Sequence, residues 1–517
     1  MPGCFDAAPK YAGRRGVGVY RRSVEAPAGV RLRLRIGALG LRGRILWDGR
    51  EVGLNELPYS LQEYEFDSGS GSRHELVILI DNRLDFADTP LFHHFYDFYG
   101  YGGIYRSVEL ETLPEKARFG RVRVETLDLS GRVLVSGTLG GGFAEISAGF
   151  DGAAPKKVDA VFNGEEFSFE AKVPSPALWS PDSPNLHLIT LKTGSDTVIE
   201  RFGLRTIRCE KGELLLNGQP LRLRGYNRHD AHPQFGPAMP DELWIEDLQI
   251  LRDLGCNFIR GCHYPQSQRF LDLCDQLGFL VWEESLGWGD SVEVQSDPKF
   301  RRLQVEQTVN MVKASINHPS VILWGFMNEG GDDKEVGASL LRELAAAVRA
   351  VDRSRPVTSA SMHIRTSIAL DVFDVVSFNL YPGWYEGDNT ADPRPLDRIA
   401  PTLDEVLARL NTKELRDKPL ILSEIGAGAI YGWRDRVAGI WSEEYQADYL
   451  DAVCAYFRRK KRLTGLALWQ FADGRTYAAG GVLGRPRAFN NKGTLDEYRR
   501  PKLAYDVVKK HFGGSGK

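Results

Sequence analysis

The sequence predicts a multidomain protein in which two β-sandwiches precede a (β/α)8 barrel. Two observations indicate this fold class. Before residue 207, short stretches of alternating apolar and polar residues are separated by turns, without helical periodicity. After residue 207, strand-like apolar runs alternate with amphipathic stretches of helical spacing. A chain of 517 residues is long enough for several domains, so both patterns fit within it.

The first region, residues 1–113, predicts a β-sandwich. Arg31–Ile36 alternates charged and apolar residues at every position, which is the pattern of a strand with one face in water. Further strand candidates are Val19–Val24, Arg44–Trp47, Glu75–Ile80 and Tyr105–Leu110. Many short strands without a helix favour two packed sheets.

The second region, residues 114–206, predicts another all-β domain. Four prolines between Val173 and Leu186 interrupt it. A length of about 90 to 100 residues is typical of an immunoglobulin-like sandwich. The strand candidates are Arg121–Glu125, Arg132–Gly137, Glu166–Val173 and Leu186–Lys192.

The third region, residues 207–517, predicts the barrel because eight strand-like stretches follow one another, most of them separated by an amphipathic helix. Eight such units in about 310 residues match the size of a (β/α)8 barrel. A doubly wound sheet is the alternative, but no Gly-rich phosphate loop follows any strand. The stretches are Leu221–Gly225, Phe258–Cys262, Phe279–Trp282, Val321–Phe326, Pro356–Ser361, Val375–Leu380, Leu420–Ser423 and Leu466–Gln470.

Composition excludes several classes of partner. A net charge of −3 offers no basic field for nucleic acid or an anionic membrane surface. No run of about 18 uncharged apolar residues occurs, so no membrane-spanning helix is expected. The six cysteines form no Cys-x-x-Cys pair, which favours reduced thiols in a cytoplasmic protein.

Two glutamates end two of the predicted barrel strands. Glu329 follows the fourth strand and Glu424 the seventh, and the carboxyl ends of barrel strands carry the active site. A single acid after a strand is commonly a solvated loop residue. Two facing carboxylates suit glycoside hydrolysis, in which one protonates the leaving oxygen and the other attacks the anomeric carbon. Asn328, directly before Glu329, can orient that acid and bind a sugar hydroxyl.

Aromatic residues cluster at the same strand ends. Tyr381, Trp384 and Tyr385 follow the sixth strand, and Trp469 and Phe471 close the eighth. Such rings stack on the C–H faces of sugars and exclude water, although each could also serve only as core packing. Trp469 is the best candidate among them because it lies at the end of a strand.

Six further segments follow one known pattern: Tyr101–Arg106, Leu216–Gly218, Arg224–His229, Arg260–Pro265, Trp324–Glu329 and Ser423–Glu424. Together they resemble glycoside hydrolase family 2. The resemblance implies a jelly-roll domain, an immunoglobulin-like domain and a catalytic barrel. It also implies a retaining mechanism in which Glu329 is the general acid/base, held protonated by a raised pKa, and Glu424 is the nucleophile.

The segment Asn379–Tyr385 is similar to the β-glucuronidase branch of that family, which implies that Asn379, Tyr381 and Tyr385 line the site. The pair Asn490 and Lys492 resembles the Asn-x-Lys element that holds the C6 carboxylate of the sugar. An ammonium paired with a buried carboxylate favours an acid sugar over its neutral counterpart.

Further candidates come from the same resemblance. Arg485 and Arg487 lie near the position of a carboxylate-binding arginine of the family, and either can bind the sugar carboxylate. Arg487 is the one we include among the predicted substrate-binding residues. His229 with Asp230 resembles a substrate-binding pair, although a buried orienting histidine is the alternative. Asp97 matches a jelly-roll aspartate that reaches the sugar, although the sequence alone favours a loop aspartate that stabilises a turn.

These observations lead to a retaining exo-β-glucuronidase that acts on small glucuronides. A β-galacturonidase differs only in the C4 hydroxyl and stays open, as does a β-galactosidase. A non-catalytic carbohydrate-binding protein is the alternative of another class. No metal-ligand spacing is visible, so we expect no required cofactor. The resemblance also implies a possible homo-oligomer.

Overall fold

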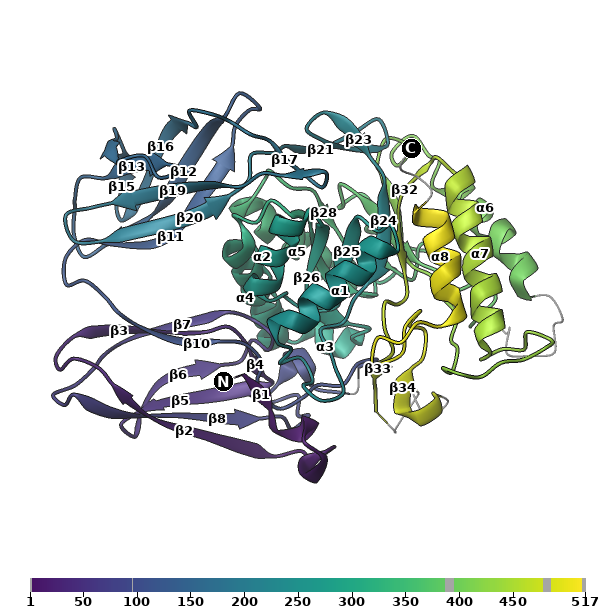
Figure 1. The fold of residues 1–517 in the computed structure, drawn as a ribbon, viewed down its shortest axis with the longest axis horizontal. Coiled ribbons are helices and arrows are strands. Elements are labelled where there is room, and N and C mark those ends of the chain that lie inside the picture. Colours follow the sequence, from purple (N-terminus) through teal and green to yellow (C-terminus); the bar gives the residue numbers. More distant parts are fainter. Residues whose placement is uncertain (1, 95, 386–394, 478–484, 514–517) are drawn as a thin grey trace.

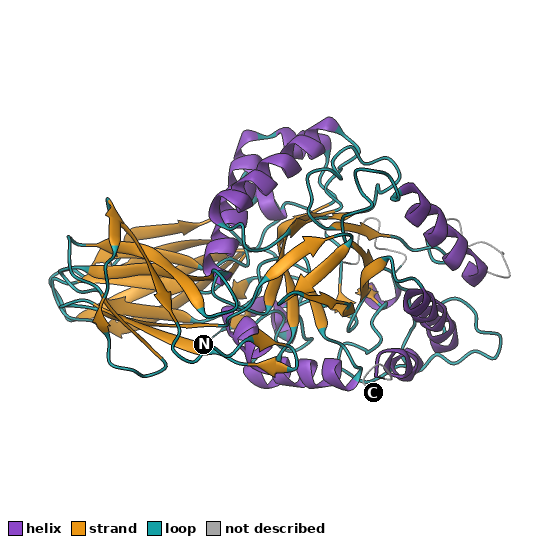
Figure 2. Cartoon of the chain, turned by 90° about the horizontal axis from the view of Figure 1, so that it is seen from above, coloured by secondary structure: helices purple, strands orange, loops and turns teal. Residues whose placement is uncertain are grey.

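The computed structural model describes residues 2–94, 96–385, 395–477 and 485–513. Two β-rich regions lie beside each other at one side of the molecule, and a barrel surrounded by helices forms the other side (Figure 1). The view from above shows the strands of the barrel enclosed by helices, with the β-rich regions extending away from it (Figure 2). The predicted multidomain fold class is therefore confirmed.

The first β-rich region packs a four-stranded sheet against a three-stranded sheet. Their orders are β2-β8-β5-β6 and β10-β3-β7, and β1-β9-β4 forms a small third sheet. Alternation in β3 places Leu32, Leu34 and Ile36 in the core between them. The strands are β1 Gly3–Cys4, β2 Val17–Glu25, β3 Arg31–Ile36, β4 Leu39–Gly40, β5 Arg42–Trp47, β6 Arg50–Asn55, β7 Gln62–Asp67, β8 Arg73–Asp81, β9 Gly103–Ile104 and β10 Val108–Thr112.

The second β-rich region has two four-stranded antiparallel sheets, ordered β11-β12-β16-β15 and β14-β13-β19-β20. Val133 and Val135 of one sheet and Ile189 and Leu191 of the other are fully buried in its own core. The strands are β11 Arg118–Thr126, β12 Arg132–Gly140, β13 Ser147–Phe150, β14 Lys156–Lys157, β15 Val161–Asn163, β16 Glu166–Lys172, β17 Trp179–Ser180, β18 Ser183–Pro184, β19 His187–Lys192 and β20 Thr197–Phe202.

A small antiparallel sheet leads into the barrel, whose strands are parallel and pair in the order β28-β27-β26-β25-β24-β32-β31-β30-β29. The predicted fifth strand is divided: β28 pairs with β27 and β29 pairs with β30, so its two halves close the barrel. The strands are β21 Ile207–Glu210, β22 Glu213–Leu216, β23 Gln219–Leu221, β24 Leu223–Asn227, β25 Phe258–Gly261, β26 Leu280–Trp288, β27 Val321–Asn328, β28 Val357–Thr358, β29 Ala360–Ser361, β30 Val376–Asn379, β31 Leu420–Glu424 and β32 Leu463–Leu468.

Helices cover the outside of the barrel because each has one apolar face. In α5, Leu340, Leu341, Leu344 and Val348 are buried at helical spacing, as the sequence predicts. No helix in the described ranges is long and apolar enough to cross a bilayer. The helices are α1 Asp241–Asp253, α2 Gln268–Leu277, α3 Val292–Ser296, α4 Pro298–Ser315, α5 Glu335–Val351, α6 Ile399–Arg409, α7 Glu443–Arg459 and α8 Leu503–Gly513.

Three loops attach the first β-rich region to the barrel: those between β6 and β7, between β9 and β10, and the long connection between β8 and β9. Tyr59 stacks on Tyr264 with ring centroids 3.9 Å apart. Arg106 donates from Nη2 to the carbonyl of Pro265 at 2.7 Å. Within the β8–β9 connection, the Tyr96 hydroxyl donates to Asp290 Oδ1 at 3.3 Å and the Phe98 ring lies 5.4 Å from that of Tyr264, so the segment that carries Asp97 is held against the carboxyl ends of the barrel strands.

Candidate active site

The two predicted acids meet at one cavity. Glu424 is the last residue of β31, and Glu329 follows β27 directly with φ of +54°, a left-handed conformation that is rare for a residue with a side chain. The cavity has a volume of about 310 Å³ and is lined by Asp97, Trp288, Glu329, Met362, Arg365, Asn379, Leu380, Tyr381, Tyr385, Glu424, Trp469 and Arg485. This volume is of the size that a monosaccharide requires.

Asn379 orients the first acid. Its Nδ2 donates to Glu329 Oε1 at 2.9 Å and to Asn328 Oδ1 at 3.0 Å, while its Oδ1 accepts from the Ser423 hydroxyl. Burial raises the pKa of Glu329 to about 8, and repulsion from Glu424 adds to the rise. Glu329 is therefore protonated at neutral pH, as a general acid must be.

Glu424 lies in a different environment, although it is equally close to the cavity. Arg260 donates to its Oε1 at 2.7 Å, and the Tyr381 hydroxyl donates to its Oε2 at 2.7 Å. Burial holds the pKa of Glu424 above its usual value, and the Arg260 cation and the two hydrogen bonds oppose that rise. The charged form of Glu424 thus has partners that Glu329 lacks, which suits a nucleophile beside an acid.

Arg260 is a functional residue that sequence reasoning did not single out. It is fully buried at the end of β25 and also contacts Glu284 at 2.7 Å and Asn328 Oδ1 at 2.8 Å. One guanidinium therefore positions site residues of three strands, β26, β27 and β31. Its segment, Arg260–Pro265, matched the family pattern, but a charge buried within a barrel cannot be recognised before the fold is known.

His263 was missed for the same reason. Its Nδ1 lies 2.8 Å from Glu284 Oε1, and its ring stacks on Trp469 at a centroid distance of 5.3 Å. The buried Nε2 has no hydrogen-bond partner among the described residues and lies 4.0 Å from Glu424 Oε1. His229 likewise keeps an unpaired buried Nε2 and packs edge-on against Trp469. Both rings pack behind Trp469, and neither is among the residues that line the cavity.

A basic group, Lys492, lies directly behind the wall of the cavity that Tyr385 lines. Lys492 is buried, and its Nζ donates to the Tyr385 hydroxyl at 2.5 Å and lies 4.6 Å from the centre of that ring. Asn490 donates to Asp97 Oδ2 at 2.9 Å, and Arg485 donates to the same oxygen at 2.6 Å. Burial and the neighbouring Arg485 lower the pKa of Lys492. A bound carboxylate would oppose that shift.

The structure does not bring Arg487 into the cavity. Its Nη1 pairs with Glu497 at 2.8 Å, and its Nη2 donates to Asn491. Arg485, the other arginine that the sequence left open, lines the cavity instead. Asp230 also lies elsewhere, because Arg228 and the Trp244 indole bind its carboxylate in the protein interior.

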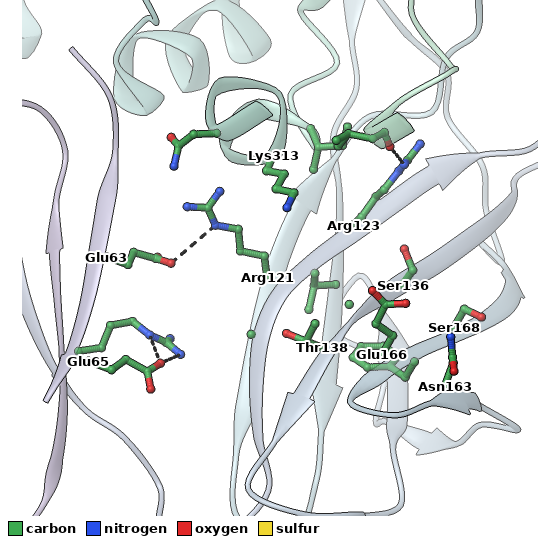
Figure 3. A pocket seen from close by; sticks show the side chains of 18 of the residues that line it. Glu63, Glu65, Arg121, Arg123, Ser136, Thr138, Asn163, Glu166, Ser168 and Lys313 are labelled. Carbon is green, nitrogen blue, oxygen red and sulfur yellow. Dashed lines mark hydrogen bonds and ion pairs between the residues drawn. The ribbon is translucent and has the colours of Figure 1, made fainter. Parts of the chain in front are cut away.

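The larger hollow of about 870 Å³ lies where the first and second β-rich regions meet the barrel (Figure 3). We call it the inter-sandwich cleft; Glu63 and Glu65 line one side, and Arg121, Glu166 and Lys313 line the other. Arg121 faces Glu63 across it at 3.6 Å. These charges are partly exposed, so the cleft lacks the desolvated acids of the barrel cavity.

Fold and site together define a class of protein. A (β/α)8 barrel that presents two carboxylic acids in different environments to one sugar-sized cavity is the architecture of a glycosidase. Two family descriptions match the chain: "Glycosyl hydrolases family 2, TIM barrel domain" over residues 207–514 and "Glycosyl hydrolases family 2" over residues 112–205. The chain belongs to glycosyl hydrolase family 2, which confirms the resemblance seen in the sequence.

Solved structures with the same fold include a GH2 β-galacturonidase from Eisenbergiella tayi bound to galacturonate. It is 36% identical, with a TM-score of 0.92 over 100% of this chain and 93% of its own. A Bifidobacterium dentium β-glucuronidase complexed with coumarin-3-O-glucuronide is 25% identical, with a TM-score of 0.89 over 99% of this chain and 91% of its own.

Curated relatives include the β-glucuronidase of Mus musculus, which is 27% identical over 81% of this chain. The alignment spans 64% of the mouse protein's length. A β-galactosidase from Thermoanaerobacter pseudethanolicus is 31% identical over 62% of this chain and 44% of its own length. The relatives thus act on acid and on neutral sugars, and the choice between them depends on the site.

Proposed function

We propose that this protein is a retaining exo-β-glucuronidase that hydrolyses β-D-glucuronides. The observation that carries the proposal is the buried amine of Lys492, which donates to the Tyr385 hydroxyl directly behind the wall of the cavity that Glu329, Glu424 and Tyr385 line. A buried cation without a carboxylate partner is costly, and a uronic acid supplies that partner. The mouse and B. dentium relatives support this substrate class.

The mechanism assigns one role to each acid. Glu424, ionised beside Arg260, attacks the anomeric carbon and forms a covalent glycosyl-enzyme. Glu329, protonated because its pKa is about 8, donates its proton to the leaving oxygen. Once ionised, Glu329 takes a proton from water, which then releases the sugar with its β configuration retained.

The same residues explain how the sugar is oriented. Lys492 and Asn490 bind the C6 carboxylate. Arg485 and Asn490 hold Asp97 through its Oδ2, and Asp97 Oδ1 has no protein partner among the described residues. Asn328 keeps Nδ2 free of partners in the same set of residues, so it can donate to a ring hydroxyl. Trp469 packs one face of the pocket.

A β-galacturonidase is the second candidate, because the E. tayi structure bound to galacturonate is the more similar of the two solved structures described above. Glucuronate and galacturonate differ only in the direction of the C4 hydroxyl. Both satisfy Lys492 equally well, so the two candidates share the same mechanism and the same acid-binding residues.

A panel of four aryl β-glycosides tests the proposal: glucuronide, galacturonide, glucoside and galactoside. We expect kcat/KM for the glucuronide to exceed that for the glucoside by at least about tenfold, the factor that one charged hydrogen bond of 1.4 kcal/mol provides. A higher value for the galacturonide than for the glucuronide would establish the second candidate. Comparable hydrolysis of the neutral sugars would refute both, and no hydrolysis at all would favour a binding protein.

Two further proposals concern the setting of the enzyme. The six cysteines are all free, which supports a cytoplasmic location. The sequence resemblance supports assembly into a homo-oligomer, which the molar mass in solution would reveal.

A further inference from the structure

Two histidines of the first β-rich region face an aspartate of the barrel. His93 and His94 follow a short 3-10 helix, Pro90–Phe92, and Asp290 lies two residues after β26. Each residue offers one ligand atom, and these atoms all lie within 4.8 Å of one another. The segments are far apart in the sequence, so no motif announces this cluster.

The aspartate has an unused oxygen. Asp290 is only 6% exposed; its Oδ1 accepts from the Tyr96 hydroxyl at 3.3 Å, but its Oδ2 has no hydrogen-bond partner in the described part of the chain. A buried carboxylate oxygen without a partner costs stability, so such an atom indicates a missing ligand.

The histidines present their ring nitrogens to each other. His93 Nδ1 donates to the carbonyl of Pro90 at 2.8 Å, which leaves its Nε2 as a lone pair. His94 Nδ1 lies 2.7 Å from that Nε2. Orientation of an imidazole by a backbone carbonyl is the usual arrangement behind a metal-binding histidine. A proton shared by the two rings is the alternative to an ion between them.

We propose that His93, His94 and Asp290 bind a divalent transition-metal ion, with Zn²⁺ as the best match. Two imidazoles and one carboxylate are ligands that Zn²⁺ accepts, whereas Mg²⁺ and Ca²⁺ prefer oxygen ligands only. Three protein ligands leave at least one coordination position for water.

The ion would connect two domains near the catalytic cavity. Tyr96, whose hydroxyl binds Asp290, packs edge-on against Trp288 of the cavity wall at a centroid distance of 6.0 Å. The next residue, Asp97, binds Arg485 and Asn490. Because His93 and His94 come from the same connection, the metal would fasten the segment that delivers Asp97 to the site.

Another group of potential ligands serves as a matched control. His318 lies close to Asp272 and Asp275, but both of its ring nitrogens already have protein partners: Asp275 at 2.6 Å and Gln268 at 3.2 Å. That cluster needs no ion. The group His229, Cys262 and His263 belongs to the catalytic site and contains a thiol, which gives it a distinct spectrum with Co²⁺.

The test measures metal binding by the full-length protein, independently of its activity. After treatment with EDTA and removal of the chelator, ZnCl₂ is titrated by calorimetry, and bound zinc is counted by elemental analysis. We expect one Zn²⁺ per chain in the wild type and in His318→Gln. His93→Gln, His94→Gln and Asp290→Asn should each weaken binding by about tenfold or more. Zn²⁺ should also raise the melting temperature of the wild type but not of these variants.

Three outcomes would overturn the proposal. The first is that the wild type takes up no zinc, which would leave the shared proton as the explanation of the histidine pair. The second is that zinc binding is unchanged in both His93→Gln and His94→Gln. The third is that Co²⁺ gives a thiolate-to-metal charge-transfer band, which would locate the ion at Cys262 instead.

Discussion

The catalytic cavity and the inter-sandwich cleft differ in volume and in how far their charged side chains are exposed to water. The smaller of the two holds the more deeply buried charges. The cleft is the larger, at about 870 Å³ against about 310 Å³. Its acids and bases are partly exposed, as for Arg121 and Glu63, whose side chains are 35% and 26% accessible. In the cavity, the side chain of Glu424 is 5% accessible and that of its partner Arg260 is fully buried.

The difference shows that desolvation of charge, rather than volume, marks the reactive place in this molecule. A charge in the cleft loses little by facing water, and its ion pairs contribute little to stability. A charge in the cavity is stable only because specific hydrogen-bond and ion-pair partners compensate it. Removing one of these partners therefore changes the reactivity of the site as well as the stability of the protein. The following predictions test this contrast, from the largest effect to the smallest.

The largest effect is expected from Glu424→Gln. The amide keeps the volume of the side chain but cannot attack the anomeric carbon, so kcat should fall by roughly 10⁴-fold or more. Steady-state kinetics with an aryl glucuronide measures it. Activity within about tenfold of the wild type would remove Glu424 from the nucleophile's role, because such a factor is only 1.4 kcal/mol.

Lys492→Met should act selectively on the acid sugar. Loss of a buried cation that binds a carboxylate costs about 2–5 kcal/mol, so kcat/KM for the uronide should fall roughly 30- to 4,000-fold. The neutral glycoside should change far less. The control is Lys502→Met, which removes another buried ammonium, one that pairs with Asp473 at 2.8 Å outside the cavity. It should leave the ratio of the two substrates unchanged, and equal losses in Lys492→Met would contradict the assignment.

The pH profile should have an alkaline limb set by Glu329. Its pKa is raised to about 8, and the protonated form is the active one, so kcat/KM should hold below that pH and fall about tenfold per unit above it. An alkyl glucuronide, which needs protonation of its leaving oxygen, should show the limb fully. A nitrophenyl glucuronide should show it weakly. Persistence of the limb for the alkyl substrate in Glu329→Gln would assign it to another group.

The smallest effect is expected in the inter-sandwich cleft. Arg121→Ala removes an ion pair of 3.6 Å with Glu63 at the surface of both domains. The free energy of unfolding should fall by less than about 1 kcal/mol, and kcat/KM should not change. Urea denaturation and the aryl glucuronide assay measure the two quantities. A marked loss of activity would mean that the cleft is coupled to the barrel.

The barrel shows how much of the fold can be predicted from the sequence. Each of the eight predicted stretches contains residues that form a strand in the structure. Short apolar runs of this length are typical of buried strands, so the prediction depends only on local sequence. The fifth is divided into β28 and β29 around Ser359, a break that local pattern does not reveal because it arises from closing the barrel. The site divides in the same way: Glu329, Glu424 and Lys492 stand in recognisable segments, whereas Arg260 and His263 matter only through distant partners.

By itself, then, the sequence determined which segments become strands and helices, the family, and the two acids, because periodicity and short motifs are local properties of the chain. Tertiary structure alone decided that Arg485 and not Arg487 faces the cavity, because Glu497 binds the guanidinium of Arg487 outside it. It also decided that His93, His94 and Asp290 meet. Long-range proximity and loss of solvent set the charge state of a buried group, and neither quantity is written in the order of the residues.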